Sequence, residues 1–512
     1  MNVRNVHGKE KRKGIEIVKK FADFGFQVQP EAIELLNQSE AESRFSLSEI
    51  VESVANSLDT SIFVISSEQI AEFIKNSRAE DGEKGTCFQR QAPVTAPAIV
   101  QSFSDGQRGV DHNDFLPLFL DRYARISGII KKRMNCGQIR FIKKGMRGKE
   151  VSVVGMVSSV NKTAKGNLRV ELEDPTGHLS IIMQRQEEIT PDETIGVTGS
   201  LYDGGYLFAN RVIRPDVPLP SPASQLSLPL SAGYNSTSGS NDGERGERNE
   251  KQKQTYAVFI SDMHVGSNTF VEESWDSFVQ WLKEKAESIG IAYLIVAGDI
   301  VDGIGVYPGQ ENDLSIMDIG EQYKTAAGYF HDFPSYIHVV VSPGNHDAVR
   351  NAEPQPPLPE NIRKLFPDNT CFVSNPAYIK IGGRLVLIYH GQSYDDFVSS
   401  VSRLSYSKPT EVMAEMLRRR HVAPIYGKIV SIIPNGHDYG VIYPVPDIFH
   451  CGHVHTVGIS KYRNVLLINS GAWQSQTPYQ KKRGITPVPG CATLVELYEM
   501  KAKVMDFGSR AG

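Results

Sequence analysis

The stretch AYLIVAGDIVDG (Ala292–Gly303) passes from apolar, largely β-branched residues directly into glycine and aspartate. An apolar run of this length, bounded by glycine and aspartate, predicts a buried β-strand. Asp299 follows the run at once, so its carboxylate is expected just beyond the carboxyl end of that strand. A polar group at such a position indicates a binding or catalytic site at one edge of a sheet.

Four more stretches end in the same way, each an apolar run that gives way to residues able to bind metal. They are YAVFISDMH (Tyr256–His264), YIHVVVSPGNHD (Tyr336–Asp347), RLVLIYHG (Arg384–Gly391) and FHCGHVHT (Phe449–Thr456). Five such endings are expected to converge on one edge of a sheet, which chance does not readily explain. Together they supply Asp262, His264, Asp299, Asn345, His346, His390, His453 and His455.

The ligand types in these endings indicate the class of metal. Carboxylate, amide and imidazole without thiolate favour a pair of hard or borderline divalent ions such as Mn²⁺, Mg²⁺, Fe²⁺ or Zn²⁺. Taken alone, FHCGHVHT also fits a structural zinc site with Cys451 as a ligand, or histidines with no ligand role. A structural zinc site usually needs two paired clusters, and the sequence contains no second CxxC or HxxxH pair. We therefore expect Cys451 to pack as a small buried residue.

In chain order the endings read DMH, GDIVD, GNHD, YHG and GHVH, and this series resembles the motif blocks of the calcineurin-like metallophosphoesterases. The resemblance implies an α/β fold in which a metallophosphoesterase β-sandwich is flanked by helices. It implies that one metal ion is held by Asp262, His264, Asp299 and His455. It implies that a second ion is held by Asp299, Asn345, His390 and His453, with Asp299 as the bridge. His346 would lie over the phosphate, outside the ligand set.

The chemistry of such a centre follows from its charge. Two cations about 3.5–4 Å apart activate a bridging water, orient a phosphate and neutralise the charge that develops during in-line attack. A shared carboxylate is needed to hold the ions so close, and the resemblance implies that Asp299 has that role. His346 is expected to protonate the leaving oxygen, because the pKa of histidine lies near neutral. Asp347 either orients His346 or caps the loop, and the sequence does not decide between these two roles.

Length and composition limit what surrounds the site. A chain of 512 residues predicts two to four domains at about 100–200 residues each. The 55 basic and 59 acidic residues give a net charge of −4, so any basic surface for nucleic acid must be local. Five cysteines without paired spacing are typical of a reducing cytoplasm. No apolar run approaches about 18 residues, and the amino terminus lacks a signal-peptide core, so we expect a soluble, intracellular protein without membrane contact.

Two polar segments, 77–113 and 221–254, predict linkers, the second of them Ser/Gly-rich and flexible. Residues 1–76 contain GIEIVKKFADFGF and SLSEIVESVANSL, whose apolar spacing predicts a small helical docking module. Residues 114–220 are expected to form a β-barrel domain and residues 255–512 the phosphoesterase domain.

The barrel is predicted by five short strand patterns that follow one another closely. They are EVSVVGMVSSV, NLRVELED, HLSIIMQR, ETIGVTGSLY and GYLFANRVI. Five such strands over roughly 70 residues favour an OB-like barrel, a fold that often binds single strands. Tyr202, Tyr206 and Phe208 are the best candidates for stacking on bases, although a barrel that docks a protein fits the sequence equally well. The run Lys131–Lys149 carries eight basic residues and no acid, which fits either a phosphate track or a solvated face.

The domain order resembles that of the small subunits of archaeal family-D DNA polymerases, whose phosphoesterase domain is a 3′-to-5′ exonuclease. The resemblance implies a manganese-dependent proofreading nuclease in DNA replication, a large catalytic subunit as partner in a heterodimer or larger assembly, and DNA with a single-stranded or mismatched 3′ end as substrate. Eukaryotic accessory B-subunits have a similar architecture but have lost the metal ligands, whereas this sequence keeps them all. A non-catalytic scaffold and a stand-alone phosphatase or cyclic-nucleotide phosphodiesterase are the alternatives.

Overall fold

A computed structural model describes residues 27–29, 32, 33, 64, 65, 95–104, 111–142, 148–184, 187–202, 205–219 and 254–508. The chain divides into two compact units, residues 1–93 and 94–512. In the first unit, β1 (Gln27–Val28) and β2 (Val64–Ile65) pair in parallel. The two helical patterns expected within residues 1–76 lie outside the described residues, as does the linker expected at 221–254 except for its last residue.

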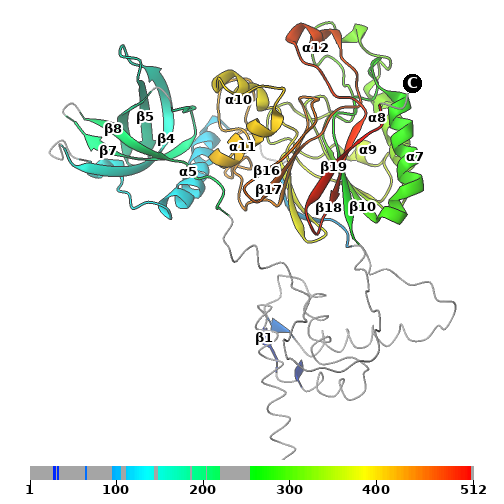
Figure 1. The fold of residues 1–512 in the computed structure, drawn as a ribbon, viewed down its shortest axis with the longest axis horizontal. Helices are drawn as coiled ribbons and strands as arrows, with labels where there is room; N and C mark the ends of the chain where they lie inside the picture. Colours follow the sequence, from blue (N-terminus) through cyan, green and yellow to red (C-terminus); the bar gives the residue numbers. More distant parts are fainter. Residues whose placement is uncertain are drawn as a thin grey trace, which may run out of the picture. The chain divides into compact units, whose positions relative to one another are not determined.

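The second unit contains two six-stranded sheets (Figure 1). The first has the strand order β12 (Thr370–Phe372), β11 (His338–Ser342), β10 (Ile291–Ala297), β9 (Tyr256–Ile260), β18 (Cys491–Glu496) and β19 (Lys501–Asp506). The second has the order β16 (Gly458–Tyr462), β17 (Val465–Asn469), β15 (Ile448–Cys451), β14 (Arg384–Ile388), β13 (Ala377–Ile381) and β3 (Ala98–Ser102). All five apolar runs predicted as strands are therefore confirmed as β9, β10, β11, β14 and β15.

The two sheets pack face to face because successive side chains of a strand point to opposite faces. Phe259 and Ile295 of the first sheet share one buried core with Ile388 of the second. Alternate residues of the first sheet, such as Val258, instead pack in a second core with helices α7 (Glu272–Ile289) and α8 (Ile319–His331). The opposite face of the second sheet packs in a third core with α10 (Tyr394–Ser400) and α11 (Pro409–Arg419). The mixed α/β class is thereby confirmed.

Residues 150–213 form a closed five-stranded barrel. Its order is β4 (Glu150–Lys162), β5 (Leu168–Asp174), β6 (Gly177–Met183), β8 (Tyr206–Ile213) and β7 (Thr194–Leu201). Fully buried Val153, Val170 and Ile181 fill its interior, as the alternating sequence pattern requires. The five predicted strands are confirmed, while the assignment of an OB fold stays a prediction.

The linker expected at 77–113 is corrected for residues 95–104. Strand β3 pairs antiparallel with β13 at the edge of the second sheet. The segment is anchored on both sides, because the hydroxyl of Tyr293 donates to the carbonyl of Thr95 (2.7 Å) and the amide of Phe103 donates to Ser374 Oγ (2.7 Å). The run AIVQS is short and follows a proline, and its partner strand lies some 280 residues further along the chain. Local patterning therefore does not reveal it.

The barrel side of the unit is joined to the sheets through α5 (Phe115–Lys131). Ile126 and Ile130 of this helix pack against Val154 of the barrel. From the same helix, fully buried Arg122 donates through Nε to Asp438 Oδ2 and through Nη1 to the carbonyl of Pro424, both at 2.6 Å. Burial alone would raise the pKa of Asp438, but the Arg122 guanidinium holds it well below its usual range. This ion pair therefore joins α5, which packs against the barrel, to the segment between α11 and β15.

Replacing Arg122 by leucine is expected to lower the free energy of unfolding by about 3–5 kcal/mol, because Asp438 would remain buried without its charged partner. Denaturant unfolding measures the change. Arg169→Leu is a suitable control, since Arg169 is 45% exposed in its ion pair with Glu171 and such pairs contribute about 0–1 kcal/mol. Equal unfolding midpoints for the two variants would show that the buried pair does not stabilise the junction.

Among the described residues, no helix combines the length and the apolar character that crossing a membrane requires.

Candidate metal centre

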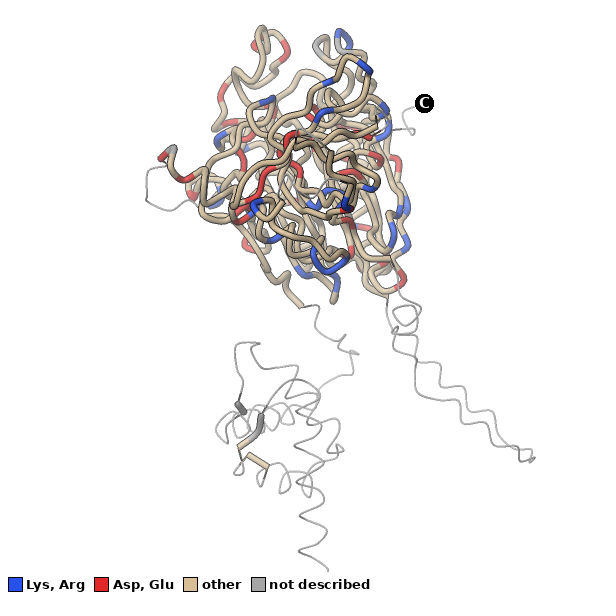
Figure 2. The backbone as a smooth tube through the Cα atoms, turned by 90° about the vertical axis from the view of Figure 1, so that its left-hand side faces the viewer, with Lys and Arg blue, Asp and Glu red and all other residues tan. Residues whose placement is uncertain are grey.

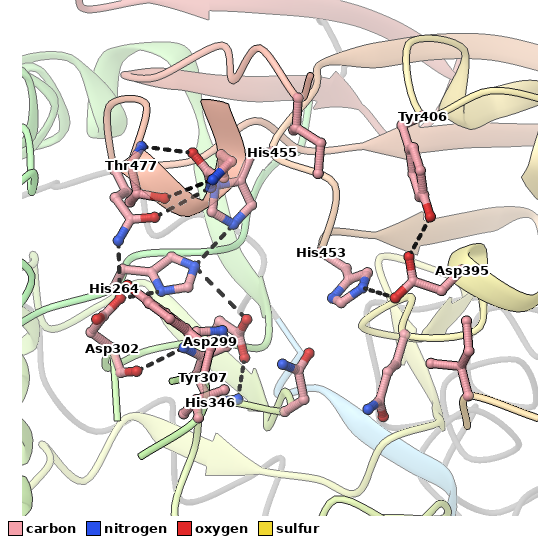
Figure 3. A pocket seen from close by; sticks show the side chains of 17 residues that line it. His264, Asp299, Asp302, Tyr307, His346, Asp395, Tyr406, His453, His455 and Thr477 are labelled. Carbon is pink, nitrogen blue, oxygen red and sulfur yellow. Dashed lines mark hydrogen bonds and ion pairs between the residues drawn. The ribbon is translucent and has the colours of Figure 1, made fainter. Parts of the chain in front are cut away.

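Six of the eight residues singled out from the sequence line one pocket, and the other two, Asp262 and His390, belong to clusters with residues of that lining. Strands β9, β10 and β11 run parallel and so end at one edge of the first sheet, and β14 and β15 do the same in the second. The ligand-bearing loops therefore meet where the two edges lie side by side. The pocket has a volume of 450 Å³, and its lining includes His264, Asp299, Asn345, His346, His453 and His455 (Figure 3).

The backbone of these loops is strained at the residues that carry the chemistry. Left-handed φ angles of +52° to +70° occur at Asp262, His264, Asp299, His453 and His455. Each such residue costs on the order of 1–3 kcal/mol and persists where the surroundings enforce it, which is typical of functional sites. Glycine is required beside them: a Cβ on Gly298 would lie 2.5 Å from His390 Nδ1, and one on Gly344 would overlap the carboxylate of Asp299.

One cluster of potential ligands consists of Asp262, His264 and His455, whose ligand atoms lie within 4.8 Å of one another. The Nε2 atoms of the two histidines are 3.0 Å apart, and His455 Nε2 lies 3.4 Å from Asp262 Oδ1. All three side chains are buried. Buried carboxylate and imidazole atoms that lie this close together form a site suited to a cation.

A second cluster consists of Asp299, His390 and His453. His390 Nε2 lies 3.2 Å from Asp299 Oδ2 and 3.1 Å from Asn345 Oδ1, so the asparagine also faces this cluster. The same Oδ2 atom of Asp299 lies 3.8 Å from His264 Nε2 of the first cluster. Asp299 thus stands between the two clusters, where a bridging carboxylate is needed.

Hydrogen bonds to the far ring nitrogens orient two of the histidines. His390 Nδ1 donates to the carbonyl of Ala297 (2.8 Å), which leaves the Nε2 lone pair for the cluster. His264 Nδ1 lies 2.9 Å from Asp302 Oδ1, which fixes the same tautomer. Such partners hold the ring in place and increase its basicity as a ligand.

The electrostatics of the site favour a cation. Burial and the nearby charge of Asp299 raise the pKa of Asp262 to about 6. Burial opposes protonation of His390, but the charge of Asp299 raises the pKa of His390 to about 10. Two buried carboxylates therefore depend on positive charge in the pocket, which divalent ions would supply. With carboxylate, amide and imidazole donors, the residues present fit hard or borderline divalent ions.

His346 lies on the wall of the pocket. Its amide donates to Asp299 Oδ1 (2.9 Å), and its Nδ1 donates to the carbonyl of Asp302 (2.7 Å). Nε2 is therefore the ring nitrogen left for a substrate, and burial lowers the pKa of the ring. Asp347 does not act on His346 through any of its described contacts. Its carboxylate accepts from Gly344 N (2.8 Å) and the Tyr323 hydroxyl (3.0 Å), so these contacts favour the loop cap.

Several residues of the pocket were not singled out from the sequence. The lining also contains Asp302, Tyr307, Gln392, Asp395, Tyr406, Gln474, Thr477 and Gln480. Of these, only Asp302 carries a sequence signal, because it is the second aspartate of GDIVD. Cys451, in contrast, is buried in the core with Val454, as expected.

The candidates for nucleic-acid contact on the barrel are partly brought together. Tyr202 and Phe208 are 54% and 41% exposed, and their rings make an edge contact at 4.6 Å. Arg169 lies over the ring of Tyr206 at 5.3 Å. Part of the basic run Lys131–Lys149, residues 143–147, lies outside the described residues. Figure 2 shows basic and acidic residues interspersed along the described backbone.

Comparisons with known proteins show the family to which the chain belongs. Residues 257–457, which include all eight candidate residues, match the family described as the B subunit of DNA polymerase alpha/epsilon. The DNA polymerase II small subunit of Archaeoglobus fulgidus is 40% identical over 495 residues, which cover 93% of this chain and 94% of that protein. This chain belongs to the archaeal DNA polymerase II small subunit family.

A second member of the archaeal DNA polymerase II small subunit family, from Methanothermobacter thermautotrophicus, is 35% identical over 518 residues, covering 96% of this chain and 99% of that protein. Among solved structures, one described as a novel archaeal phosphodiesterase is 11% identical, with a TM-score of 0.25, and covers 49% of this chain and 99% of that chain. A score of this size is too low for a shared fold to be inferred from it.

Proposed function

We propose that this chain is the small subunit of a two-subunit replicative DNA polymerase and carries a dinuclear-metal 3′-5′ exonuclease that proofreads newly made DNA. One observation carries the proposal: Asp299 lies between two ligand clusters in a pocket that also holds His346. A chain that served only as a scaffold would need neither the paired clusters nor the strained loops that build them.

The residues that would hold the ions are those of the two clusters. Asp262, His264, Asp299 and His455 would form the first site. Asp299, Asn345, His390 and His453 would form the second. When bound, such ions activate water, orient the phosphodiester and neutralise developing charge, and we expect Mn²⁺ in this role.

The chain's own residues do the remaining work. Asp302 and the carbonyl of Ala297 fix the tautomers of His264 and His390. His346, held through Nδ1, would present Nε2 to the terminal phosphodiester and, when protonated, pass that proton to the leaving oxygen. The result is hydrolysis that releases a mononucleotide from the 3′ end.

The polymerase II relatives are named small subunits, which implies a large subunit that supplies DNA synthesis. We propose that this chain docks such a subunit, through regions that include the barrel or the amino-terminal unit. A scaffold role would then accompany the nuclease. The alternative of a stand-alone phosphatase or cyclic-nucleotide phosphodiesterase gives no account of the barrel fixed beside the catalytic sheets.

The test is an exonuclease assay on the purified chain, alone and with its co-purifying large subunit. Single-stranded and 3′-mismatched DNA labelled at the 5′ end should shorten stepwise with Mn²⁺, and EDTA should stop the reaction. Hydrolysis of phosphomonoesters or cyclic nucleotides, with DNA left intact in both preparations, would replace this proposal by the stand-alone alternative. A complex that assembles but hydrolyses none of these substrates would favour a non-catalytic scaffold role.

A further inference from the structure

The far ring nitrogens of the ligand histidines show a pattern that extends beyond the motif residues. His264 has Asp302 at 2.9 Å from Nδ1, and His390 has a backbone carbonyl at 2.8 Å. His453 belongs to the same cluster as His390, and none of its described ring contacts is to another residue of GHVH. Its ring lies instead beside a carboxylate from another element, since His453 Nε2 is 3.8 Å from Asp395 Oδ2.

Asp395 is held in place by a second residue. It lies in the first turn of α10, and Tyr406 lies in the segment between α10 and α11. The Tyr406 hydroxyl donates to Asp395 Oδ1 at 2.6 Å, so the other carboxylate oxygen is the one nearest to His453. Figure 3 shows Tyr406, Asp395 and His453 in this sequence along one side of the pocket.

We propose that Asp395, steadied by Tyr406, is a positioning residue that prepares His453 to bind the second metal ion; this inference rests on the proposed dinuclear centre. At 3.8 Å the Asp395 carboxylate lies within ion-pair distance of His453 Nε2. A negative charge on that side favours the tautomer with its hydrogen on Nε2, which leaves the Nδ1 lone pair available to an ion. Asp395 would thus orient His453 through its charge at 3.8 Å, whereas Asp302 contacts His264 at hydrogen-bond distance, 2.9 Å. In each of the two metal sites, a carboxylate would then orient one of the histidine ligands.

The two carboxylates differ in where they come from. Asp302 is part of the block that also carries Asp299, whereas Asp395 comes from a helix that follows the RLVLIYHG ending and packs on the opposite face of the second sheet. The second ion is therefore the one whose binding depends on the packing of α10 and α11. Changes in these helices are expected to affect one site and spare the other.

Titration of the purified full-length chain with Mn²⁺ by calorimetry tests the proposal. The unmodified chain should bind two ions. In Asp395→Ala one of the two should bind about 10–100-fold more weakly, the usual cost of losing such a partner, while the other keeps its affinity. Asp395→Asn should recover part of the loss, because an amide oxygen of the same shape stays beside Nε2 although the charge is removed. Tyr406→Phe should shift the same site by a smaller factor.

A second tyrosine–aspartate pair, formed by Tyr462 of β16 and Asp216, provides matched controls. The Tyr462 hydroxyl donates to Asp216 Oδ1 at 2.9 Å, the same chemistry with neither residue in the pocket lining. Tyr462→Phe and Asp216→Asn should leave both Mn²⁺ affinities unchanged.

The outcomes separate this inference from the function on which it rests. An unmodified chain that binds fewer than two ions would overturn the dinuclear centre and this proposal together. Two ions in the unmodified chain and two equally tight ions in Asp395→Ala would overturn the positioning role alone. Loss of both sites in Asp395→Ala, with a lower melting temperature, would also overturn it, because the residue would then be structural.

Discussion

Replacing Asp299 by alanine is expected to weaken both metal sites and to reduce phosphodiester hydrolysis to background. The reason is geometric: one carboxylate oxygen of Asp299 lies 3.2 Å from His390 Nε2 and 3.8 Å from His264 Nε2, in different clusters. Losing a shared ligand should cost each site more than the ~10–100-fold typical of losing an outer partner. Metal content by mass spectrometry and Mn²⁺ titration measure the first effect, and an exonuclease assay measures the second.

Two further variants keep this prediction independent of folding. Asp299 also accepts the His346 amide, so Asp299→Ala disturbs the loop. Asp299→Asn keeps an acceptor there but removes the charge, and it should lose both ions as well. Cys451→Ser is the control, because Cys451 is buried in the core and should leave metal content and hydrolysis largely intact. A tightly held zinc ion that Cys451→Ser removes would contradict the dinuclear assignment.

Replacing His346 by alanine is expected to slow DNA cleavage by about 10²- to 10⁴-fold, the usual contribution of a positioned general acid. Both ions should still bind, because His346 is not among the residues assigned to the two sites, all of which are unchanged. In complex with a large subunit, the variant should go on extending primers and fail to remove a mismatched 3′ end. Parallel extension and mismatch-removal assays, with Mn²⁺ titration of the same preparation, measure this split.

His331→Ala provides a matched histidine control. His331 is exposed on α8 and its ring contacts the carbonyl of Leu365, outside the pocket lining, so cleavage should be unchanged. Excision of mismatches by His346→Ala at the unmodified rate would remove His346 from the mechanism. Loss of extension together with excision would indicate that the residue is needed for the structure of the complex instead.

The sequence was sufficient for the parts of the site that depend on local pattern. Asp299 follows an apolar run, and parallel strands end at a common edge, so the convergence of the endings could be predicted before any contact was seen. The five barrel strands were equally accessible, because side-chain alternation is also a local property.

The features that could not be predicted from the sequence depend on contacts between residues far apart in the chain. Strand β3 needs β13, about 280 residues away, to be recognised as a strand. Asp395 and Tyr406 reach the pocket only because α10 and α11 fold over the second sheet. The role of Asp347 depended on which donors surround its carboxylate, and the structure supplies Gly344 N and the Tyr323 hydroxyl.

Anomalous diffraction from crystals of the chain grown with Mn²⁺ tests the central claim most directly. The account predicts two manganese peaks in the pocket, both in contact with the carboxylate of Asp299, one beside His264 and the other beside His390. A single peak in that pocket, or metal bound elsewhere with Asp299 free of it, would contradict the dinuclear centre on which the proposed exonuclease depends.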